Sequence, residues 1–160
     1  MDALREEAGI SLRRMYRLYP SKDALVAGYL RWRDERWRTW LRQRVEQRAP
    51  QPSARPLAVF DALAEWFADE GFRGCALVNA SAELGETIPA VHRQAEQHKR
   101  AVRAYLAELL REAGHRKQND DELAAELMLL IDGAIVQASI AGDTTAAQRA
   151  QSIARRLLAS

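Results

Sequence analysis

The sequence predicts an all-α fold. Apolar residues recur at intervals of three and four along most of the 160 residues, and no segment shows the alternation typical of a strand. Gly or Pro stands at the ends of most of these periodic segments. Hydrophobic residues make up 48% of the chain and charged residues 29%, as in an ordinary globular domain. The pattern indicates about eight helices around one core.

Three helices are expected in the N-terminal part. Residues 2–8 form the end of a helix that Gly9 closes. Ser11 caps a short helix, which Pro20 must end. Ser21 caps a third helix that runs to about Arg48. In this helix we expect an apolar stripe formed by Leu25, Tyr29, Trp32, Trp37 and Leu41.

Glycines and prolines also divide the rest of the chain. Residues 49–56 read as a linker, and Ser53 and Pro56 open the helix that follows. A short helix from Cys75 stops at Gly85, and the next one runs from Pro89 to Gly114. Asn119 or Asp120 caps an apolar helix that contains residues 127–136. The last helix follows a turn at 142–143 and has Ile153 and Leu157 on its buried face.

Charge is distributed unevenly along the chain. Residues 1–48 hold 12 Lys and Arg against 7 Asp and Glu, a net of +5, while residues 49–160 carry a net of −3. A basic N-terminal segment favours contact with a polyanion. We find no apolar run near the length of a membrane span and no signal peptide, and so expect a cytoplasmic protein without a membrane partner.

The stretch from Ser11 to Lys22 carries three arginines and no acidic residue. A helix, a turn with Gly and a short helix form the layout of a helix-turn-helix. A helix that reads DNA needs donors on one side and packing groups on the other. Met15 and Tyr19, four residues apart, can face the supporting helix. The alternative is an arginine-rich face that is merely solvated.

The outward side of the same helix carries the candidate DNA contacts. Tyr16 offers a hydroxyl group to a phosphate or a ring to a thymine methyl. Lys22 and the free N–H groups behind the Ser21 cap form an anion site. The candidate set is Ser11, Leu12, Arg13, Arg14, Tyr16, Arg17 and Lys22.

The stretch LREEAGISLRRMYRLYPSKDAL resembles the tetracycline-repressor (TetR) family of bacterial transcriptional regulators. The resemblance implies that the recognition helix is Leu12 to Tyr19, and that Tyr16 and Lys22 touch DNA. The matching positions are Leu4, Ala8, Gly9, Ile10, Ser11, Met15, Tyr16, Arg17, Tyr19, Ser21, Lys22, Asp23, Ala24 and Leu25.

The chain also departs from the family pattern. Arg5 stands where a small Ala is usual, and Arg14 replaces the usual Thr. Leu12 and Leu18 occupy positions where polar or histidine side chains are common. Met1 aligns near the start of the family's second helix, so the resemblance predicts that the first helix is absent from these residues. The expected division is a partial DNA-binding domain, 1–30, and an effector-binding and dimerisation domain, 31–160.

The segment that begins GFRGCALVNASAEL is similar to one branch of the same family, in which this region encloses an effector pocket. We expect a mostly apolar cavity lined by Trp66, Phe67, Cys75, Asn79, His98, Tyr105 and Met128. Other readings stay open for three of them: Cys75 as a small buried filler rather than a redox sensor, Asn79 as a cap or bridge, and His98 as a core histidine. The tryptophans 32, 37 and 40 are expected to pack the third helix against the body.

In the family the last two long helices pair across a two-fold axis, and the apolar surface of residues 121–159 agrees with this. The expected homodimer interface is Leu127, Leu130, Ile131, Ile135, Ile153 and Leu157, although ordinary core positions are the alternative.

Catalytic and metal sites are not predicted. The single cysteine, Cys75, excludes a disulfide within the chain and a Cys-based zinc cage. His92 and Glu96 share a helix face but lack a third ligand. We see no nucleophile–base–acid set and no phosphate-binding loop, and expect no cofactor.

The resemblance implies a ligand-responsive regulator, a repressor that binds a palindromic operator as a homodimer and is released by a largely apolar small-molecule effector. The alternatives are a helical ligand-binding or dimerisation protein with a defective DNA-binding module and, more weakly, a helical enzyme.

Overall fold

The computed structural model describes Glu7, Gly9 and residues 11–115 and 120–159, and these residues form helices without any strand. This confirms the all-α prediction. The helices are α2 (Leu12–Leu18), α3 (Lys22–Arg48), η1 (Pro52–Ala54), α4 (Arg55–Phe67), α5 (Ala76–Leu84), α6 (Pro89–Glu112), α7 (Asp120–Ala141) and α8 (Ala146–Ala159).

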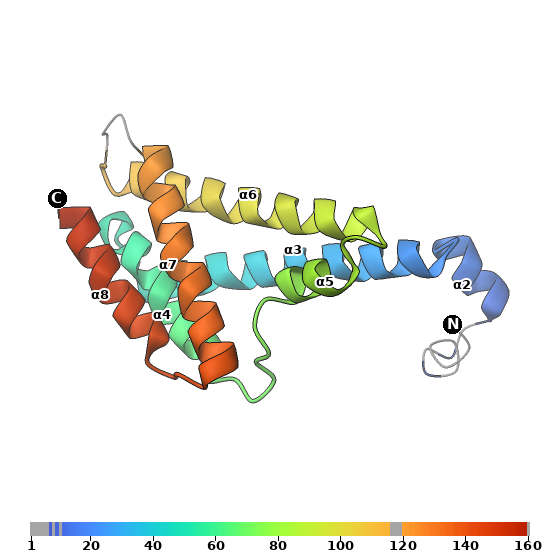
Figure 1. The fold of residues 1–160 in the computed structure, drawn as a ribbon. Coiled ribbons are helices and arrows are strands. Elements are labelled where there is room, and N and C mark those ends of the chain that lie inside the picture. Colours follow the sequence, from blue (N-terminus) through green and yellow to red (C-terminus); the bar gives the residue numbers. More distant parts are fainter. Residues whose placement is uncertain (1–6, 8, 10, 116–119, 160) are drawn as a thin grey trace.

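The long helix α3 connects α2 to the helical body of the molecule (Figure 1). At one end it carries α2, which projects away from the body. Along its length it packs against α6, α5 and α4. Helices α7 and α8 complete the body at the far end, with α7 packed on α6 and α8 packed on both α4 and α7. The small N-terminal lobe and the larger helical body are therefore joined through one continuous helix.

Several predicted helix ends are confirmed. Ser11 Oγ accepts a hydrogen bond from Arg14 N at 3.3 Å, and Ser21 Oγ accepts one from Ala24 N at 3.1 Å. Gly114 follows α6 with a φ angle of +87°, the left-handed conformation expected of a glycine after a helix, and Gly9 has a φ angle of +61°. Most of the helix expected at residues 2–8, the matching positions Leu4, Ala8 and Ile10, and the candidate cap Asn119 lie outside the described residues.

Ser53 does not open α4 as predicted. It lies within the short helix η1, and α4 begins at Arg55, with Pro56 in its first turn. Pro56 suits that place because the first N–H groups of a helix have no partner within the helix. The linker is thus partly helical and shorter than expected.

The predicted apolar stripe of α3 is wrong in part. Tyr29 and Trp32 are about half exposed, whereas Leu41 is buried as expected. The buried positions are Ala27, Leu30, Asp34, Leu41 and Val45. They follow the helical period of three and four from Leu30, and position 34 on that face holds a carboxylate. The aromatic residues 29 and 32 lie off that face.

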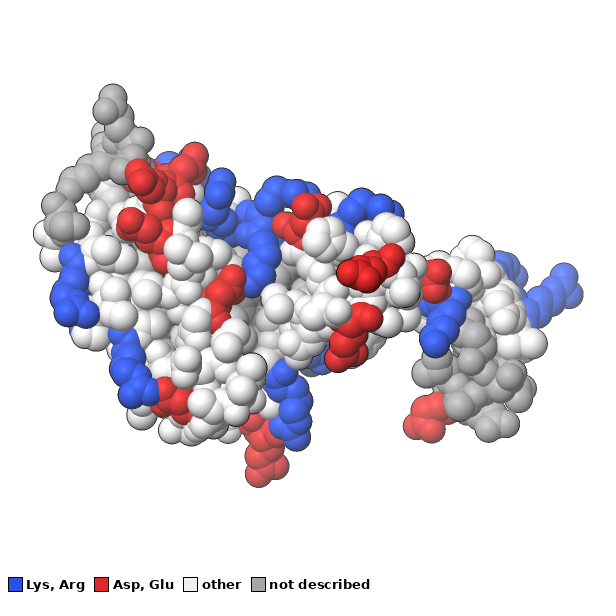
Figure 2. Space-filling view, in the orientation of Figure 1, with Lys and Arg blue, Asp and Glu red and all other residues white. Residues whose placement is uncertain are grey.

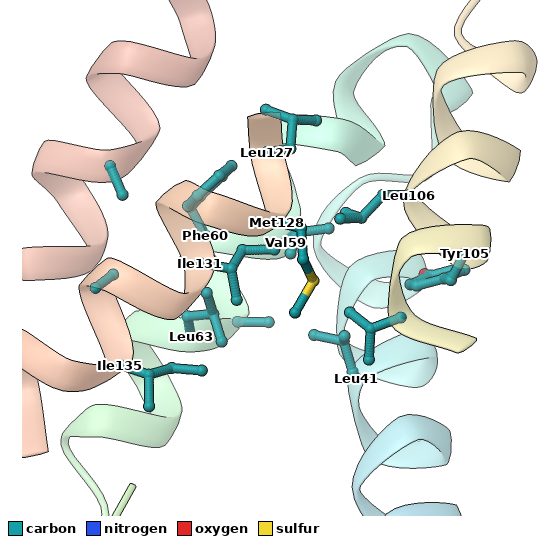
Figure 3. Packing of buried hydrophobic residues seen from close by; sticks show 14 of the residues in the cluster. Leu41, Val59, Phe60, Leu63, Tyr105, Leu106, Leu127, Met128, Ile131 and Ile135 are labelled. Carbon is teal, nitrogen blue, oxygen red and sulfur yellow. The ribbon is translucent and has the colours of Figure 1, made fainter. Parts of the chain in front are cut away.

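The core lies where α4, α6 and α7 meet the second half of α3 (Figure 3). Phe60 and Leu63 of α4 pack with Leu106 of α6 and Leu127 of α7, and all four side chains are fully buried. Each such side chain contributes about 1.5–3 kcal/mol of hydrophobic stabilisation. This packing fixes the body against which the functional groups are arranged.

Helix α7 is long and apolar enough to cross a membrane by length and composition alone, which differs from the sequence expectation. Its 22 residues contain a window with a mean hydropathy of 1.7. In the structure it packs between α6 and α8, with Leu127 and Ile131 fully buried. Core helices commonly reach such hydropathy when one face is buried and another is apolar as well.

The junction between α2 and α3 rests on a close contact. The ring of Tyr19 lies against Gly28 of α3. Its predicted contact with the supporting helix of the motif lies outside the described residues. A Cβ atom added at Gly28 would lie 2.6 Å from Tyr19 Cε1, far inside van der Waals distance. Gly28 therefore makes room for the ring that holds the end of α2 on α3.

We predict that Gly28→Ala will displace the Tyr19 ring and loosen α2. Hydrogen–deuterium exchange should become faster in residues 11–22 and stay unchanged in α6, because the added methyl group cannot share space with the ring. Thr39→Ala in α3 is the control, since position 39 is exposed and lies outside the contact with Tyr19. Equal exchange of residues 11–22 in the wild type and Gly28→Ala would contradict the role of this contact.

Candidate functional site

The first candidate site is the outer face of α2. Its predicted contact residues Ser11, Leu12, Arg13, Arg14, Tyr16 and Arg17 are all exposed, while Met15 between them is buried. Tyr16 keeps 45% of its surface accessible. Lys22, also exposed, stands at the first position of α3 behind the Ser21 cap. Figure 2 shows basic side chains at the outer end of this small lobe, well separated from the body.

The second candidate site is a cavity inside the body, enclosed by α3, α4, α5, α6 and α7. Its volume is about 30 Å³, which leaves room for one or two water molecules. Four of the seven predicted ligand-binding residues line it: Trp66, Cys75, His98 and Met128. The sequence did not indicate the charged side chains in the same wall, which are Arg33, Lys99 and Asp132.

The other three predicted ligand-binding residues lie elsewhere. Phe67 packs against Trp66 and Phe72, with ring centroids 6.0 and 4.9 Å away. Tyr105 lies under Arg42, whose guanidinium carbon is 4.1 Å from the ring centroid. Burial raises the pKa of Tyr105 to about 12, and its hydroxyl group has no hydrogen-bond partner among the described residues. Neither side chain reaches the cavity.

Asn79 is exposed and also lies outside the cavity. Its amide Nδ2 donates a hydrogen bond to the carbonyl oxygen of Arg73 at 3.0 Å, so it ties the segment before α5 to that helix. It also lines a neighbouring open groove of about 520 Å³ between α5 and α7. Val78, Val136 and Ile140 make this groove largely apolar.

The cavity and the groove share four wall residues: Cys75, Lys99, Asp132 and Ile135. Lys99 Nζ and Asp132 Oδ1 form an ion pair at 2.5 Å between α6 and α7. This pair belongs to the wall of both the cavity and the groove. Cys75 is the thiol in the wall of both.

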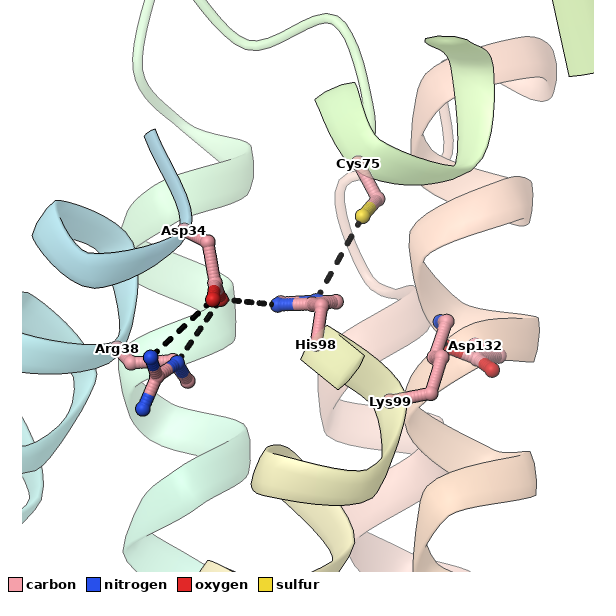
Figure 4. Close-up of polar contacts among 6 residues, drawn as sticks. All are labelled: Asp34, Arg38, Cys75, His98, Lys99 and Asp132. Carbon is pink, nitrogen blue, oxygen red and sulfur yellow. Dashed lines mark hydrogen bonds and ion pairs between the residues drawn. The ribbon is translucent and has the colours of Figure 1, made fainter. Parts of the chain in front are cut away.

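A row of polar side chains crosses the body beside the cavity (Figure 4). Arg38 donates two hydrogen bonds to Asp34, at 2.9 and 3.1 Å. Asp34 Oδ1 lies 2.7 Å from His98 Nδ1, and His98 Nε2 lies 3.8 Å from Cys75 Sγ. Asp34, His98 and Cys75 are 4%, 4% and 8% exposed. A base held between a nucleophile and an orienting carboxylate is an arrangement that sequence reasoning did not detect.

This row changes the ionisation of its members. Burial alone would raise the pKa of Asp34, but hydrogen bonds from His98 and Arg38 hold it below the ordinary value of 3.8. Burial alone would lower the pKa of His98, but Asp34 and Cys75 raise it from 6.5 to about 8. The His98 contact likewise lowers the pKa of the Cys75 thiol against the effect of burial.

Because Asp34 is ionised, it can only accept a hydrogen bond, so His98 donates from Nδ1 and turns Nε2 toward the sulfur atom. His98 is therefore a buried core histidine, which was the alternative to a ligand-binding role, and it also borders the cavity. A carboxylate on the buried face of α3, with Arg four residues later, is the sequence signal that could have located this row.

Cys75 is placed by the turn before α5. Gly74 has a φ angle of +81°, which favours glycine, and a Cβ atom there would lie 3.2 Å from Ser139 Cβ of α7. The chain thus turns closely past α7 and sets Cys75 at the N-cap position of α5.

Aromatic rings connect α3 to the cavity. The Trp37 ring lies 5.4 Å from both His98 and Trp66, and 6.5 Å from Trp40. Trp37 and Trp40 thus pack α3 against the body as expected. Trp32 does not, because it is exposed and lies beside Tyr29 and under Arg36.

The predicted dimer residues divide into two groups. Leu127, Ile131 and Ile135 belong to the core of the chain itself and are at most 7% exposed, so they offer a partner almost no surface. Leu130 and Leu157 are half-buried, and Ile153 is exposed. The large apolar side chains that α7 does expose are Leu129, Val136 and Ile140, with exposed fractions of 73%, 48% and 82%.

Among the residues that the structure describes, no group of three or more His, Cys, Asp or Glu side chains is placed to hold a metal ion.

Comparison with known proteins identifies the family. The family model for the tetracyclin repressor-like C-terminal domain matches residues 52–154, so the chain belongs to the TetR family. Its fold is similar to that of SCO4454, a TetR-family transcriptional regulator from Streptomyces coelicolor, with a TM-score of 0.82 and 26% sequence identity. That match covers 98% of this chain and 76% of SCO4454. No curated protein matches the sequence. Membership of this family implies ligand-responsive regulation of transcription.

We predict that His98 makes the free energy of unfolding depend on pH. A raised pKa stabilises the fold fully below the unfolded value of 6.5, and this contribution is lost as the pH rises through the folded value of about 8. It amounts to at most about 2 kcal/mol. In Cys75→Ser, where no thiol titrates, urea denaturation should show stability falling by about 1 kcal/mol between pH 6 and pH 9.

The fall should be absent in Cys75→Ser/His98→Gln and retained in Cys75→Ser/His92→Gln, because His92 is exposed and its polar contact is with the neutral hydroxyl group of Ser81. A pH dependence that survives the change at position 98 would contradict this assignment.

Proposed function

We propose that the chain is a homodimeric, effector-released repressor that binds a palindromic operator through α2, in the cytoplasm and without a membrane partner. The observation that carries the proposal is the seven-residue helix α2, exposed on its basic side and held at the end of α3 away from the body. A recognition helix must project in this way to enter a major groove.

The basic face supports contact with DNA. Arg13, Arg14 and Arg17 are exposed, and α2 carries no acidic residue that would repel phosphates. Tyr16 projects from the same helix, and Lys22 stands at the N-terminus of α3, where free N–H groups favour an anion. Tyr16 and Lys22 are the family's usual contact positions.

A two-fold dimer is supported by α7. Leu129, Gly133, Val136 and Ile140 follow one another at intervals of four, three and four, the spacing of an apolar seam between helices. All four positions are exposed on the single chain, and Ile153 of α8 is exposed as well. Burial of this seam against a second copy would remove it from water and set two α2 helices in a symmetric pair.

The cavity is the proposed effector site. Arg33 and Trp37 of α3 form part of its wall, and α3 is the helix that continues into the proposed DNA-binding lobe. At about 30 Å³ it must widen to hold a molecule larger than water, and widening moves α3 relative to α6. Its mainly apolar lining favours a largely apolar effector. No catalytic activity or cofactor is proposed.

We predict that Tyr16→Ala/Lys22→Ala weakens binding to the DNA upstream of the chain's own gene at least about 10-fold in a gel shift. The reason is that each of the two side chains would contact a phosphate of the DNA backbone. The salt dependence of binding should also become shallower, since fewer counterions are released. Tyr29→Ala/Arg31→Ala, an exposed aromatic and cationic pair outside α2, is the matched control. Unchanged binding by the first double variant would refute the assignment of α2.

We predict that Val136→Glu/Ile140→Glu shifts the protein from dimer to monomer in sedimentation velocity. Both side chains are exposed on the single chain, so its fold tolerates glutamate, whereas a dimer would have to bury two unpaired carboxylates on each side. The expected weakening is at least about 10-fold in Kd. Tyr29→Glu is the control, and a double variant as dimeric as this control would show that the seam lies elsewhere.

A further inference from the structure

We propose that Cys75, His98 and Asp34 form a nucleophilic site that takes a small apolar electrophile with an activated carbon–carbon double bond, such as an α,β-unsaturated carbonyl compound. The site lies where the cavity and the groove between α5 and α7 share a wall. The addition reaction itself does not depend on the function proposed above, and only its effect on DNA binding rests on that function.

The geometry supplies the three roles that an activated thiol requires. Cys75 Sγ is the nucleophile, 3.8 Å from His98 Nε2. Asp34 orients the imidazole ring by accepting from Nδ1 at 2.7 Å. Arg38 holds both oxygens of Asp34, which keeps the carboxylate ionised and in place. A buried cysteine that merely filled space would need none of these partners.

The surroundings of the sulfur atom also favour a thiolate. Cys75 is the N-cap residue of the nine-residue helix α5, where the partial positive charge of the helix end stabilises an anion. Lys99 adds a positive charge near enough to lower the pKa of the thiol. These effects and the His98 contact act together against the burial that would keep the proton on sulfur.

The groove supplies the approach for the electrophile. Cys75 is only 8% exposed, but it lines a groove of about 520 Å³ whose walls include Val78, Val136 and Ile140. Val136 and Ile140 also belong to the proposed dimer seam, so the approach in a dimer lies on the α5 side, past Val78. The lining suits a small apolar molecule, and the cations Lys99 and Arg33 in the cavity wall suit its carbonyl oxygen.

The chemical step balances without a further reactant. The Cys75 thiolate attacks the β-carbon, a sulfur–carbon bond forms, and the π electrons of the double bond move onto the α-carbon and the carbonyl oxygen. The resulting enolate takes the proton from His98 Nε2, which leaves a neutral imidazole. A thiol and an alkene thus become a thioether, with no oxidant and no leaving group. A disulfide within the chain is excluded, since Cys75 is the single cysteine.

Formation of the thioether changes the contact between His98 of α6 and Asp34 of α3. Once His98 has given up its proton, Asp34 faces a neutral ring in place of a cation, and this weakens a buried charge pair between the two helices. The thioether also adds volume to a cavity of about 30 Å³. If the proposed function holds, both changes act on the helix that carries α2.

The test uses N-ethylmaleimide and methyl vinyl ketone as probes, with intact-mass spectrometry as the readout. A single adduct should form on the folded wild-type protein at pH 6.5, at least about 10-fold faster than on the same chain unfolded in urea, because the folded chain holds a larger fraction of the thiol as thiolate. Cys75→Ser should form none. A folded chain that reacts more slowly than the unfolded one would overturn the proposal, and this comparison needs no variant.

Variants then test the role of the base. His98→Gln and Asp34→Asn should slow adduct formation at least about 10-fold, while His92→Gln should react like the wild type. As the pH rises, the alkylation rate of the folded wild-type protein should reach its plateau at a lower pH than the rate of the unfolded chain. This profile reports on Cys75 and His98 together with the charged groups around them, which are Asp34, Arg38, Arg33, Lys99 and Asp132. A folded His98→Gln protein with the wild-type rate and profile would rule out the nucleophilic site.

A gel shift with the alkylated protein separates this inference from the proposed function. Adduct formation with loss of DNA binding supports both. Adduct formation on a protein whose DNA binding is unaffected supports the nucleophilic site and removes its regulatory role. Absence of an adduct overturns the inference, whatever the chain does with DNA.

Discussion

The contact between Asp34 of α3 and His98 of α6 is the constraint on which the site depends. A carboxylate that is 4% exposed is costly unless it is paired, and here the imidazole and the Arg38 guanidinium satisfy it. The pairing fixes the register between the two longest helices of the body. It also sets the imidazole so that its second nitrogen faces Cys75. The cavity, its wall and the sulfur chemistry all follow from this one contact.

Aromatic residues pack around that contact. The Trp37 ring lies 5.4 Å from both His98 and Trp66, and the Trp66 ring lies 4.9 Å from Phe72. Any molecule that enters the cavity must displace part of this stack or part of the polar row. Since close-packed side chains shift in discrete steps, an effector bound in this cavity, as we propose, would change the relation of α3 to α6 as a whole.

Much of the fold could be predicted from the sequence, because helix ends are marked locally by residues such as Ser11, Ser21, Pro89 and Gly114. The site could be predicted only in part. Trp66, Cys75, His98 and Met128 do line one cavity, but Asp34 escaped notice because pattern reading assigns a carboxylate to the solvent side. The row of residues 34, 98 and 75 comes from three helices, and no spacing along the chain reveals their meeting. Leu127 and Ile131 read equally well as interface or core, and burial alone distinguishes them.

The length of α3 has a mechanical consequence. Asp34 lies twelve residues from the start of that helix, about 18 Å at the rise of an α-helix. If this part of α3 moves as a straight rod, a tilt of about 10° at Asp34 would carry Lys22 and the attached α2 sideways by about 3 Å. Two copies tilting in opposite directions would change the separation of their α2 helices by about twice that amount. If the chain binds DNA as the dimer that we propose, a small rearrangement at this buried pair of side chains is enough to misalign both α2 helices with consecutive turns of the double helix.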